Sequence, residues 1–158
     1  MEIKKVVVIG SGTMGSGIAA HLCNAGIPVT LLDLTTEISE KARERIHKSR
    51  PPLLIDKSKI NNIKVGNIDE NFDSVKDADW VVEAVVERID IKHQIYDKIF
   101  KSRKDDAIVS SNTSSIPIRS YKPNTPVLGM PIGLPKTASA SSIESFILNA
   151  SVIAICIA

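Results

Sequence analysis

A glycine-rich turn near the N-terminus carries the strongest chemical signal in the sequence. Gly10, Gly12 and Gly15 follow an apolar run and precede residues that favour a helix. This spacing is typical of a turn that binds a pyrophosphate: one glycine permits the turn, the next lets the phosphate approach the backbone, and the last lets the helix pack closely. The N–H groups at the helix start then attract the phosphates. The expected contacts include Thr13 and Met14 as well as the three glycines.

An acidic residue at the end of the next apolar run adds to this signal. Asp33 follows Gly15 at the spacing expected of a carboxylate that accepts hydrogen bonds from the adenosine ribose of a dinucleotide. Because a carboxylate repels a 2′-phosphate, Asp33 favours NAD over NADP. Flavoproteins use the same turn, so FAD is an alternative cofactor, and a glycine-rich turn without any ligand is another alternative.

Polar residues also follow two later apolar runs. Glu87 comes directly after Val86, and Lys92 stands five positions beyond Glu87. From spacing alone, a surface ion pair at the start of a helix accounts for Glu87 and Lys92 as well as a ligand contact does. Residues 111–115 are small and polar, and they either cap the segment that follows or bind a cofactor or a substrate hydroxyl.

Strands and helices alternate along the part of the chain that carries these residues. Strands are expected at residues 4–9, 29–32, 63–65, 80–86 and 107–110, and the run 80–86 is interrupted only by Glu83. Helices are expected at residues 14–25, at 37–48 with Thr36 as the N-cap, and at 91–99. Such alternation predicts a single α/β domain with a doubly wound parallel sheet of the Rossmann type. Ligands bind such sheets at the carboxyl ends of the strands, where the candidate residues lie.

The end of the chain differs in composition from the rest. Between residues 123 and 158 the only charged side chains are Lys136 and Glu144, and residues 146–158 are almost wholly apolar. Residues 146–158 are too few for a membrane-spanning helix, which needs ~20 residues. We expect residues 1–120 to form the domain and residues 121–158 to form a divergent tail.

The overall composition predicts the class of protein. Hydrophobic residues make up 43% of the chain, charged residues 24%, and the net charge is +2, so neither nucleic acid nor a membrane surface is an expected partner. Cys23 and Cys156 form no cysteine–histidine cluster, so no metal is expected. The N-terminus lacks the apolar stretch of a secretory signal, which indicates a cytoplasmic protein.

Residues 10–33, 77–92 and 110–118 together resemble the N-terminal domain of the 3-hydroxyacyl-CoA dehydrogenase family. The resemblance covers about residues 3–120 and implies an oxidoreductase of fatty-acid β-oxidation, which passes hydride from the 3-hydroxyl of an acyl-CoA to NAD. It implies that Ser114 lies between the nicotinamide and the substrate, with Asn112 in the same loop. It also implies the following cofactor-binding residues: Gly10, Gly12, Thr13, Met14, Gly15, Asp33, Val86, Glu87, Lys92 and Ser114.

The sequence departs from this family beyond the serine-rich loop. The family's general base is a histidine in a His-Phe-Phe-Asn-Pro segment, oriented by a glutamate, whereas the histidines here are His21, His47 and His93. We also expect this chain to lack the family's helical second domain, which completes the acyl-CoA site and the dimer.

These departures bear on the activity of the isolated chain. Loss of a general base costs ~10²–10⁴-fold in rate, so we expect the chain to be inactive unless another chain supplies the base and the second domain. Two alternatives are a cofactor-binding module or gene-fragment product without catalysis, and a dehydrogenase of short hydroxy acids.

Overall fold

A parallel β-sheet forms the centre of the fold in this computed structural model, which describes residues 2–113 and 128–129. Its strands are β1 (Val6–Ile9), β2 (Val29–Asp33), β3 (Ile63–Asn67), β4 (Trp80–Glu83), β5 (Ile108–Ser111) and β6 (Leu128–Gly129). They follow the order β3-β2-β1-β4-β5-β6, and all five strand pairs are parallel.

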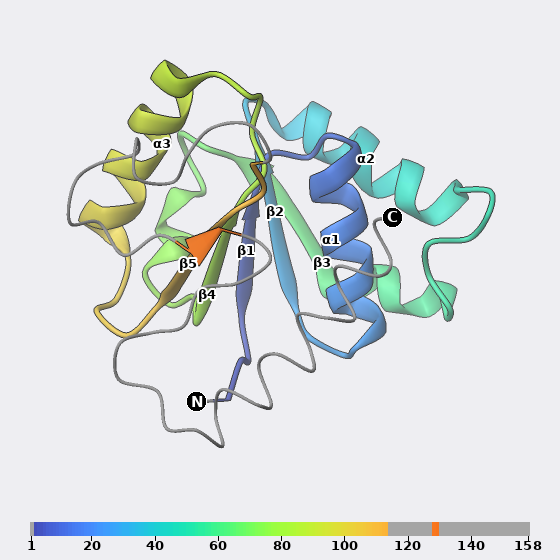
Figure 1. Cartoon of the computed structure of the whole chain (residues 1–158). Helices are drawn as coiled ribbons and strands as arrows, with labels where there is room; N and C mark the ends of the chain where they lie inside the picture. The colour runs from blue at the N-terminus through green and yellow to red at the C-terminus, as the bar shows by residue number, and fades with distance from the viewer. Residues whose placement is uncertain (1, 114–127, 130–158) are drawn as a thin grey trace.

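The chain runs outward from β1 to β3 and then returns to place β4 beside β1 (Figure 1). The strand order therefore reverses between β1 and β4, which is the point where sheets of this kind bind ligands. The prediction of an α/β fold with a doubly wound parallel sheet is confirmed.

The central strands are buried on both faces, as expected of a parallel sheet between helices. All four residues of β1 and all four of β4 are buried. Because side chains alternate along a strand, Val6 and Val8 pack into one apolar cluster while Val7 and Ile9 pack into a second cluster on the other face. This double burial explains why the strands read as continuous apolar runs.

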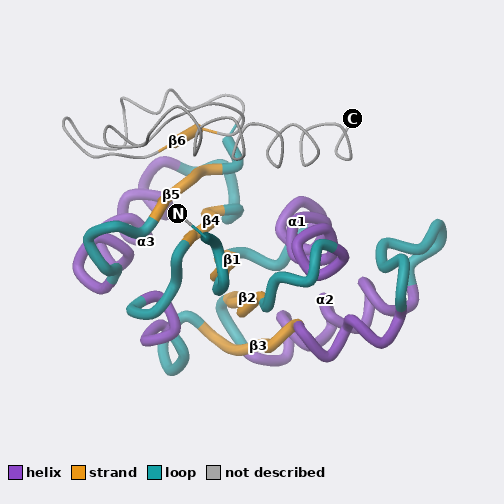
Figure 2. Tube along the Cα trace, turned by 90° about the horizontal axis from the view of Figure 1, so that it is seen from below, coloured by secondary structure: helices purple, strands orange, loops and turns teal. Residues whose placement is uncertain are grey.

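Helices cover both faces of the sheet (Figure 2). α1 (Thr13–Asn24) and α2 (Thr36–Lys48) lie on one face, and α3 (Ile89–Ser102) lies on the other. Two short 3-10 helices, Lys57–Asn62 and Phe72–Val75, complete the described elements. No helix in the described residues is long and apolar enough to cross a membrane.

Several expected element boundaries differ from the observed ones, among them the following three. The N-cap of α2 is Thr35, because its hydroxyl accepts the N–H of Ile38 at 3.3 Å, and Thr36 is the first residue of the helix. β4 ends at Glu83 instead of residue 86, because the Glu83 carboxylate accepts the N–H of Val85 at 2.8 Å and the chain leaves the sheet. β5 includes Ser111, one residue beyond the expected end.

β6 pairs with β5 inside the segment that was expected to be a divergent tail. The expected boundary at residue 120 stays a prediction, and the apolar run 146–158 lies outside the described residues.

Asp79 ties the start of the chain to the segment that enters β4. Its Oδ2 accepts the N–H groups of Lys4 and Lys5 at 2.8 and 2.9 Å, and its Oδ1 accepts a hydrogen bond from Lys104 at 2.6 Å. Partial burial acts to raise the pKa of Asp79, but the hydrogen bonds from Lys104 and the two backbone groups outweigh it. The pKa of Asp79 is therefore held below its usual value.

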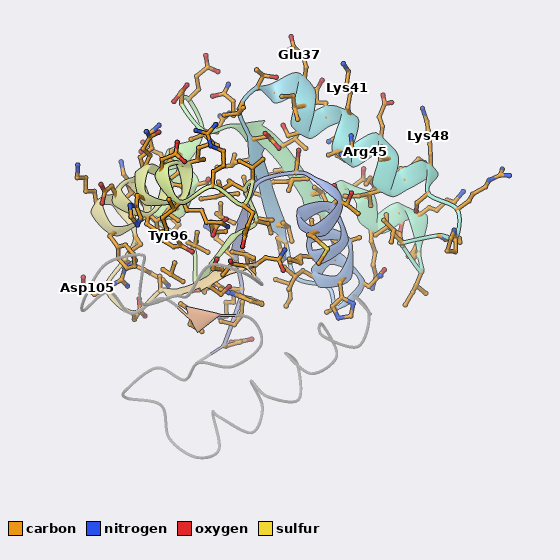
Figure 3. All side chains as sticks on the ribbon, turned by 45° about the horizontal axis from the view of Figure 1, so that its top comes forward. Glu37, Lys41, Arg45, Lys48, Tyr96 and Asp105 are labelled. Carbon is orange, nitrogen blue, oxygen red and sulfur yellow. The ribbon has the colours of Figure 1, made fainter. Side chains whose placement is uncertain are left out.

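We expect Asp79→Asn to lower the free energy of unfolding at pH 7 by about 1.5–3 kcal/mol, the range for hydrogen bonds to charged groups. A carboxylate whose folded-state pKa is lowered stabilises the fold above its unfolded-state pKa, and this contribution is lost as the pH falls through the folded-state pKa. The difference between wild type and variant should therefore shrink below about pH 4. Urea unfolding at pH 7, 4 and 3 measures this, with Asp105→Asn as the control, since Asp105 is exposed (Figure 3). A difference that stays constant with pH would contradict the expectation.

Candidate functional site

The glycine-rich turn joins β1 to α1 beside the point where the strand order reverses. Gly10 has a φ of +100°, and a Cβ there would lie 2.4 Å from the carbonyl oxygen of Ala84. A Cβ at Gly15 would lie 1.8 Å from the carbonyl oxygen of Gly10. The fold therefore requires glycine at both positions, because the turn touches the backbone after β4 at Gly10 and the first turn of α1 at Gly15.

Gly12 differs from these two glycines because nothing lies within 4 Å of a Cβ added there. It is exposed, it is the N-cap residue of α1, and no side chain caps this end of the helix. The first turn of α1, which begins with Thr13 and Met14, contains no acidic residue. Open space beside an uncapped, positively polarised helix end fits a phosphate group.

Asp33 is held against the turn by Ser11. The backbone N–H and the hydroxyl of Ser11 both donate to Oδ2 of Asp33 at 2.6 Å, and the N–H of Leu34 donates to Oδ1 at 2.8 Å. The carbonyl oxygen of Ser11 accepts hydrogen bonds from Ser16 at 2.9 Å and from the Arg45 guanidinium at 3.0 Å. The turn, β2 and α2, which carries Arg45 (Figure 3), are thus joined at one residue.

Lys92 is fully buried and lies between two carboxylates. Its Nζ lies 2.7 Å from Oε1 of Glu83 and 3.3 Å from Oε2 of Glu87. The Lys92 and Glu83 side chains are 0% exposed, whereas Glu87 is 36% exposed. Interpreting Glu87 and Lys92 as a surface ion pair is therefore wrong. No role is expected for Glu83 from the sequence, although a charge within an apolar strand is the signal that points to it.

The loops that follow β4 and β5 meet at Glu87. The hydroxyl of Thr113 donates to Oε1 of Glu87, and the N–H of Asn112 donates to the carbonyl oxygen of Glu83 at 2.7 Å. Val86 is 60% exposed beside them. Ser114 lies outside the described residues, so its expected place stays a prediction.

These groups share one edge of the sheet, at the carboxyl ends of β1, β2 and β4 (Figure 1). The N–H of Gly10 donates to the carbonyl oxygen of Leu32, and the N–H of Ala84 donates to that of Ile9, both at 2.8 Å. Asp33 therefore lies on one side of the glycine-rich turn, and the loop that leads to Glu87 lies on the other. A fold and a site of this kind define a dinucleotide-binding domain.

Comparison with known families assigns this domain. The description "3-hydroxyacyl-CoA dehydrogenase, NAD binding domain" matches residues 5–126, so the chain belongs to the 3-hydroxyacyl-CoA dehydrogenase family and contains its NAD-binding domain. The predicted family and the predicted cofactor are both confirmed.

Individual relatives agree with this assignment. The chain is 46% identical over 132 residues to a Rickettsia felis protein named as a trifunctional enzyme of the fatty acid oxidation complex. It is 44% identical over 125 residues to a Deinococcus radiodurans protein named as a 3-hydroxyacyl-CoA dehydrogenase. The two matches cover 79% and 75% of this chain, but only 18% and 36% of those relatives. The chain thus spans about a third of the length of the Deinococcus protein and less of the Rickettsia protein.

A solved structure of the family has the same fold. The crystal structure of (S)-3-hydroxybutyryl-CoA dehydrogenase from Ralstonia eutropha superimposes with a TM-score of 0.62 at 31% sequence identity. That match covers 73% of this chain and 42% of the Ralstonia chain.

Proposed function

We propose that this chain is the cofactor-binding part of an NAD-dependent dehydrogenase that oxidises the 3-hydroxyl of an acyl-CoA in fatty-acid β-oxidation. The observation that carries the proposal is the open, uncapped helix end beside Gly12, next to the fixed carboxylate of Asp33. NAD, when bound, accepts the hydride through its nicotinamide ring. The residues of this chain bind and orient it.

The adenosine half of NAD is assigned to the glycine-rich turn and Asp33. The backbone at Gly12, Thr13 and Met14 faces the pyrophosphate, and Gly10 and Gly15 keep the turn in place. A carboxylate oxygen offers two acceptor positions, and Oδ1 of Asp33 uses one of them for Leu34. A ribose hydroxyl can therefore donate to Oδ1 without breaking the contacts of Ser11 to Oδ2.

The nicotinamide half is assigned to the loops on the other side of the turn. The exposed Val86 offers an apolar surface and the partly exposed Glu87 a polar one, and Ser114 completes the assigned residues. Lys92 has no exposed surface, so we assign it the role of holding Glu87 in place through their ion pair. This differs from the direct cofactor contact that the family resemblance implied.

The general base is not assigned to any described residue. The three histidines lie on helices, His21 on α1, His47 on α2 and His93 on α3, and none stands in the loops at the carboxyl edge of the sheet. We propose that the base and the rest of the acyl-CoA site come from a partner domain, so that this chain alone binds NAD without turnover.

Parallel binding and turnover assays test the proposal. The purified chain is titrated with NADH by fluorescence, and the same sample is assayed for oxidation of NADH by acetoacetyl-CoA. Binding without turnover is expected. Turnover would mean that this chain supplies its own base. A folded chain that binds no NADH would overturn the assignment of the site.

The charge of Asp33 should set the preference between NADH and NADPH. We expect Asp33→Asn to raise the Kd for NADH by about 10–100-fold, because hydrogen bonds to a charged group contribute about 1.5–3 kcal/mol. The Kd for NADPH should stay constant or fall, since the repulsion of the 2′-phosphate is removed. Glu37→Gln, at an exposed acid on α2 (Figure 3), is the matched control and should change neither Kd. An equal rise in the Kd for NADH and the Kd for NADPH would refute this role of Asp33.

A further inference from the structure

The carboxylate of Glu83 is buried at the end of β4 and accepts four hydrogen bonds. Its Oε1 accepts from Nζ of Lys92 at 2.7 Å and from the N–H of Val85 at 2.8 Å. Its Oε2 accepts from the hydroxyl of Ser111 at 2.7 Å and from that of Tyr96 at 3.0 Å. Four donors match the roughly four acceptor positions of an ionised carboxylate.

The donors come from three different segments of the chain. Val85 belongs to the loop after β4, Lys92 and Tyr96 belong to α3, and Ser111 is the last residue of β5. Ser111 lies directly opposite Glu83 in the register of the sheet. One carboxylate therefore fixes the end of β4, the end of β5 and the first turns of α3 relative to one another.

Stability alone does not explain a charge at this position. Burying a carboxylate and an ammonium group costs several kcal/mol of hydration for each ion, and well-packed apolar residues often stabilise a fold equally well. The ion pair between Glu83 and Lys92 has one property that apolar packing lacks. Through Lys92 it is connected to Glu87, which is partly exposed at the edge of the site. Lys92 also contacts Glu87, and Glu87 accepts a hydrogen bond from Thr113.

We propose that Glu83 is a positioning residue that holds residues 84–88, which follow β4, and residues 112–113, which follow β5, in the geometry that binds the nicotinamide half of NAD. This inference rests on the proposed function, since it assigns those loops to the nicotinamide. The adenosine half is held by a separate set of hydrogen bonds, which links Asp33 to the glycine-rich turn through Ser11. Loss of the Glu83 charge should therefore affect the two halves of the cofactor unequally.

Glu83→Gln is the most direct variant because it removes the charge and keeps the shape. The amide oxygen can still accept from Lys92 and Val85, while the amide N–H₂ group can donate to the hydroxyls of Tyr96 and Ser111, which also act as acceptors. The fold can therefore tolerate the change, but the ion pair with Lys92 is replaced by a weaker hydrogen bond to a neutral amide.

The test compares the Kd for NADH with the Kd for ADP-ribose, which lacks the nicotinamide. In Glu83→Gln we expect the Kd for NADH to rise about 10-fold, as loss of a charge-assisted hydrogen bond would cause, and the Kd for ADP-ribose to change less than about 2-fold. If Glu83 had a purely structural role, the Kd for NADH and the Kd for ADP-ribose would rise together. Equal losses, or no change in either Kd, would overturn the inference.

Three further variants make the result unambiguous. Ser111→Ala and Tyr96→Phe each remove one donor to Oε2 of Glu83. Each should raise the Kd for NADH by about 3-fold and change the Kd for ADP-ribose little. They test the inference if Glu83→Gln does not fold. Lys98 lies on α3, as Tyr96 does, and forms a surface ion pair with Asp69; Lys98→Gln breaks this pair and should change neither Kd. A wild-type chain that is folded but binds neither ligand would refute the proposed function, which distinguishes that failure from a failure of the Glu83 inference.

Discussion

Gly15→Ala should destabilise the fold by about 3 kcal/mol or more, at or beyond the upper end of the usual cost of overpacking. The added Cβ would lie 1.8 Å from the carbonyl oxygen of Gly10, so the start of α1 or the glycine-rich turn has to move. Backbone atoms cannot swing aside as a flexible side chain can. A loss of this size is a large share of the ~5–15 kcal/mol that stabilises a typical domain. Urea unfolding of the purified variant measures it.

Gly12→Ala makes the same chemical change in the same turn and is the matched control. Nothing lies within 4 Å of a Cβ at this position, so the free energy of unfolding should change by no more than about 1 kcal/mol. The methyl group would instead stand where the pyrophosphate is expected, and the Kd for NADH should rise by more than about 10-fold. The expectation fails if Gly15→Ala is as stable as wild type, or if Gly12→Ala binds NADH like wild type.

Lys92→Met should cost about 3–5 kcal/mol of stability, because it leaves the buried carboxylate of Glu83 without its closest counter-ion. The methionine fills a similar volume, so the loss reports on the charge and not on a cavity. Urea unfolding at pH 7 measures this free energy.

A double variant separates the unpaired charge from a general loss of packing. Adding Glu83→Gln to Lys92→Met removes the isolated carboxylate and should restore about half or more of the lost stability, since groups in one network couple strongly. Lys48→Met is the surface control, because Lys48 pairs with Glu44 on the exposed side of α2 (Figure 3) and such pairs contribute ~0–1 kcal/mol. If Lys92→Met cost no more than Lys48→Met, the buried carboxylate of Glu83 would not depend on Lys92 as its counter-ion.

Much of the fold follows from local sequence patterns. Buried parallel strands form continuous apolar runs, so β1, β2 and β5 were placed within one or two residues of their observed bounds. The glycine-rich turn and Asp33 can be predicted as binding residues from the sequence because each expected role is tied to a position within one βαβ unit.

The remaining features depend on contacts between distant parts of the chain. Glu83 meets Ser111 only because β4 pairs with β5, and Arg45 meets Ser11 only because α2 packs beside the turn. The spacing of these residues along the sequence predicts neither contact. Residue propensities likewise cannot predict which of the two adjacent threonines caps α2, because Thr35 and Thr36 have the same capping propensity.

The decisive measurement is isothermal titration calorimetry of the wild-type chain with NADH, with folding checked by circular dichroism on the same sample. We expect saturable binding at one site per chain, with strongly weakened binding in the folded Gly12→Ala variant. A folded wild-type chain that releases no heat of binding, or a Gly12→Ala variant that binds as tightly as wild type, would contradict the claim that this turn holds NAD.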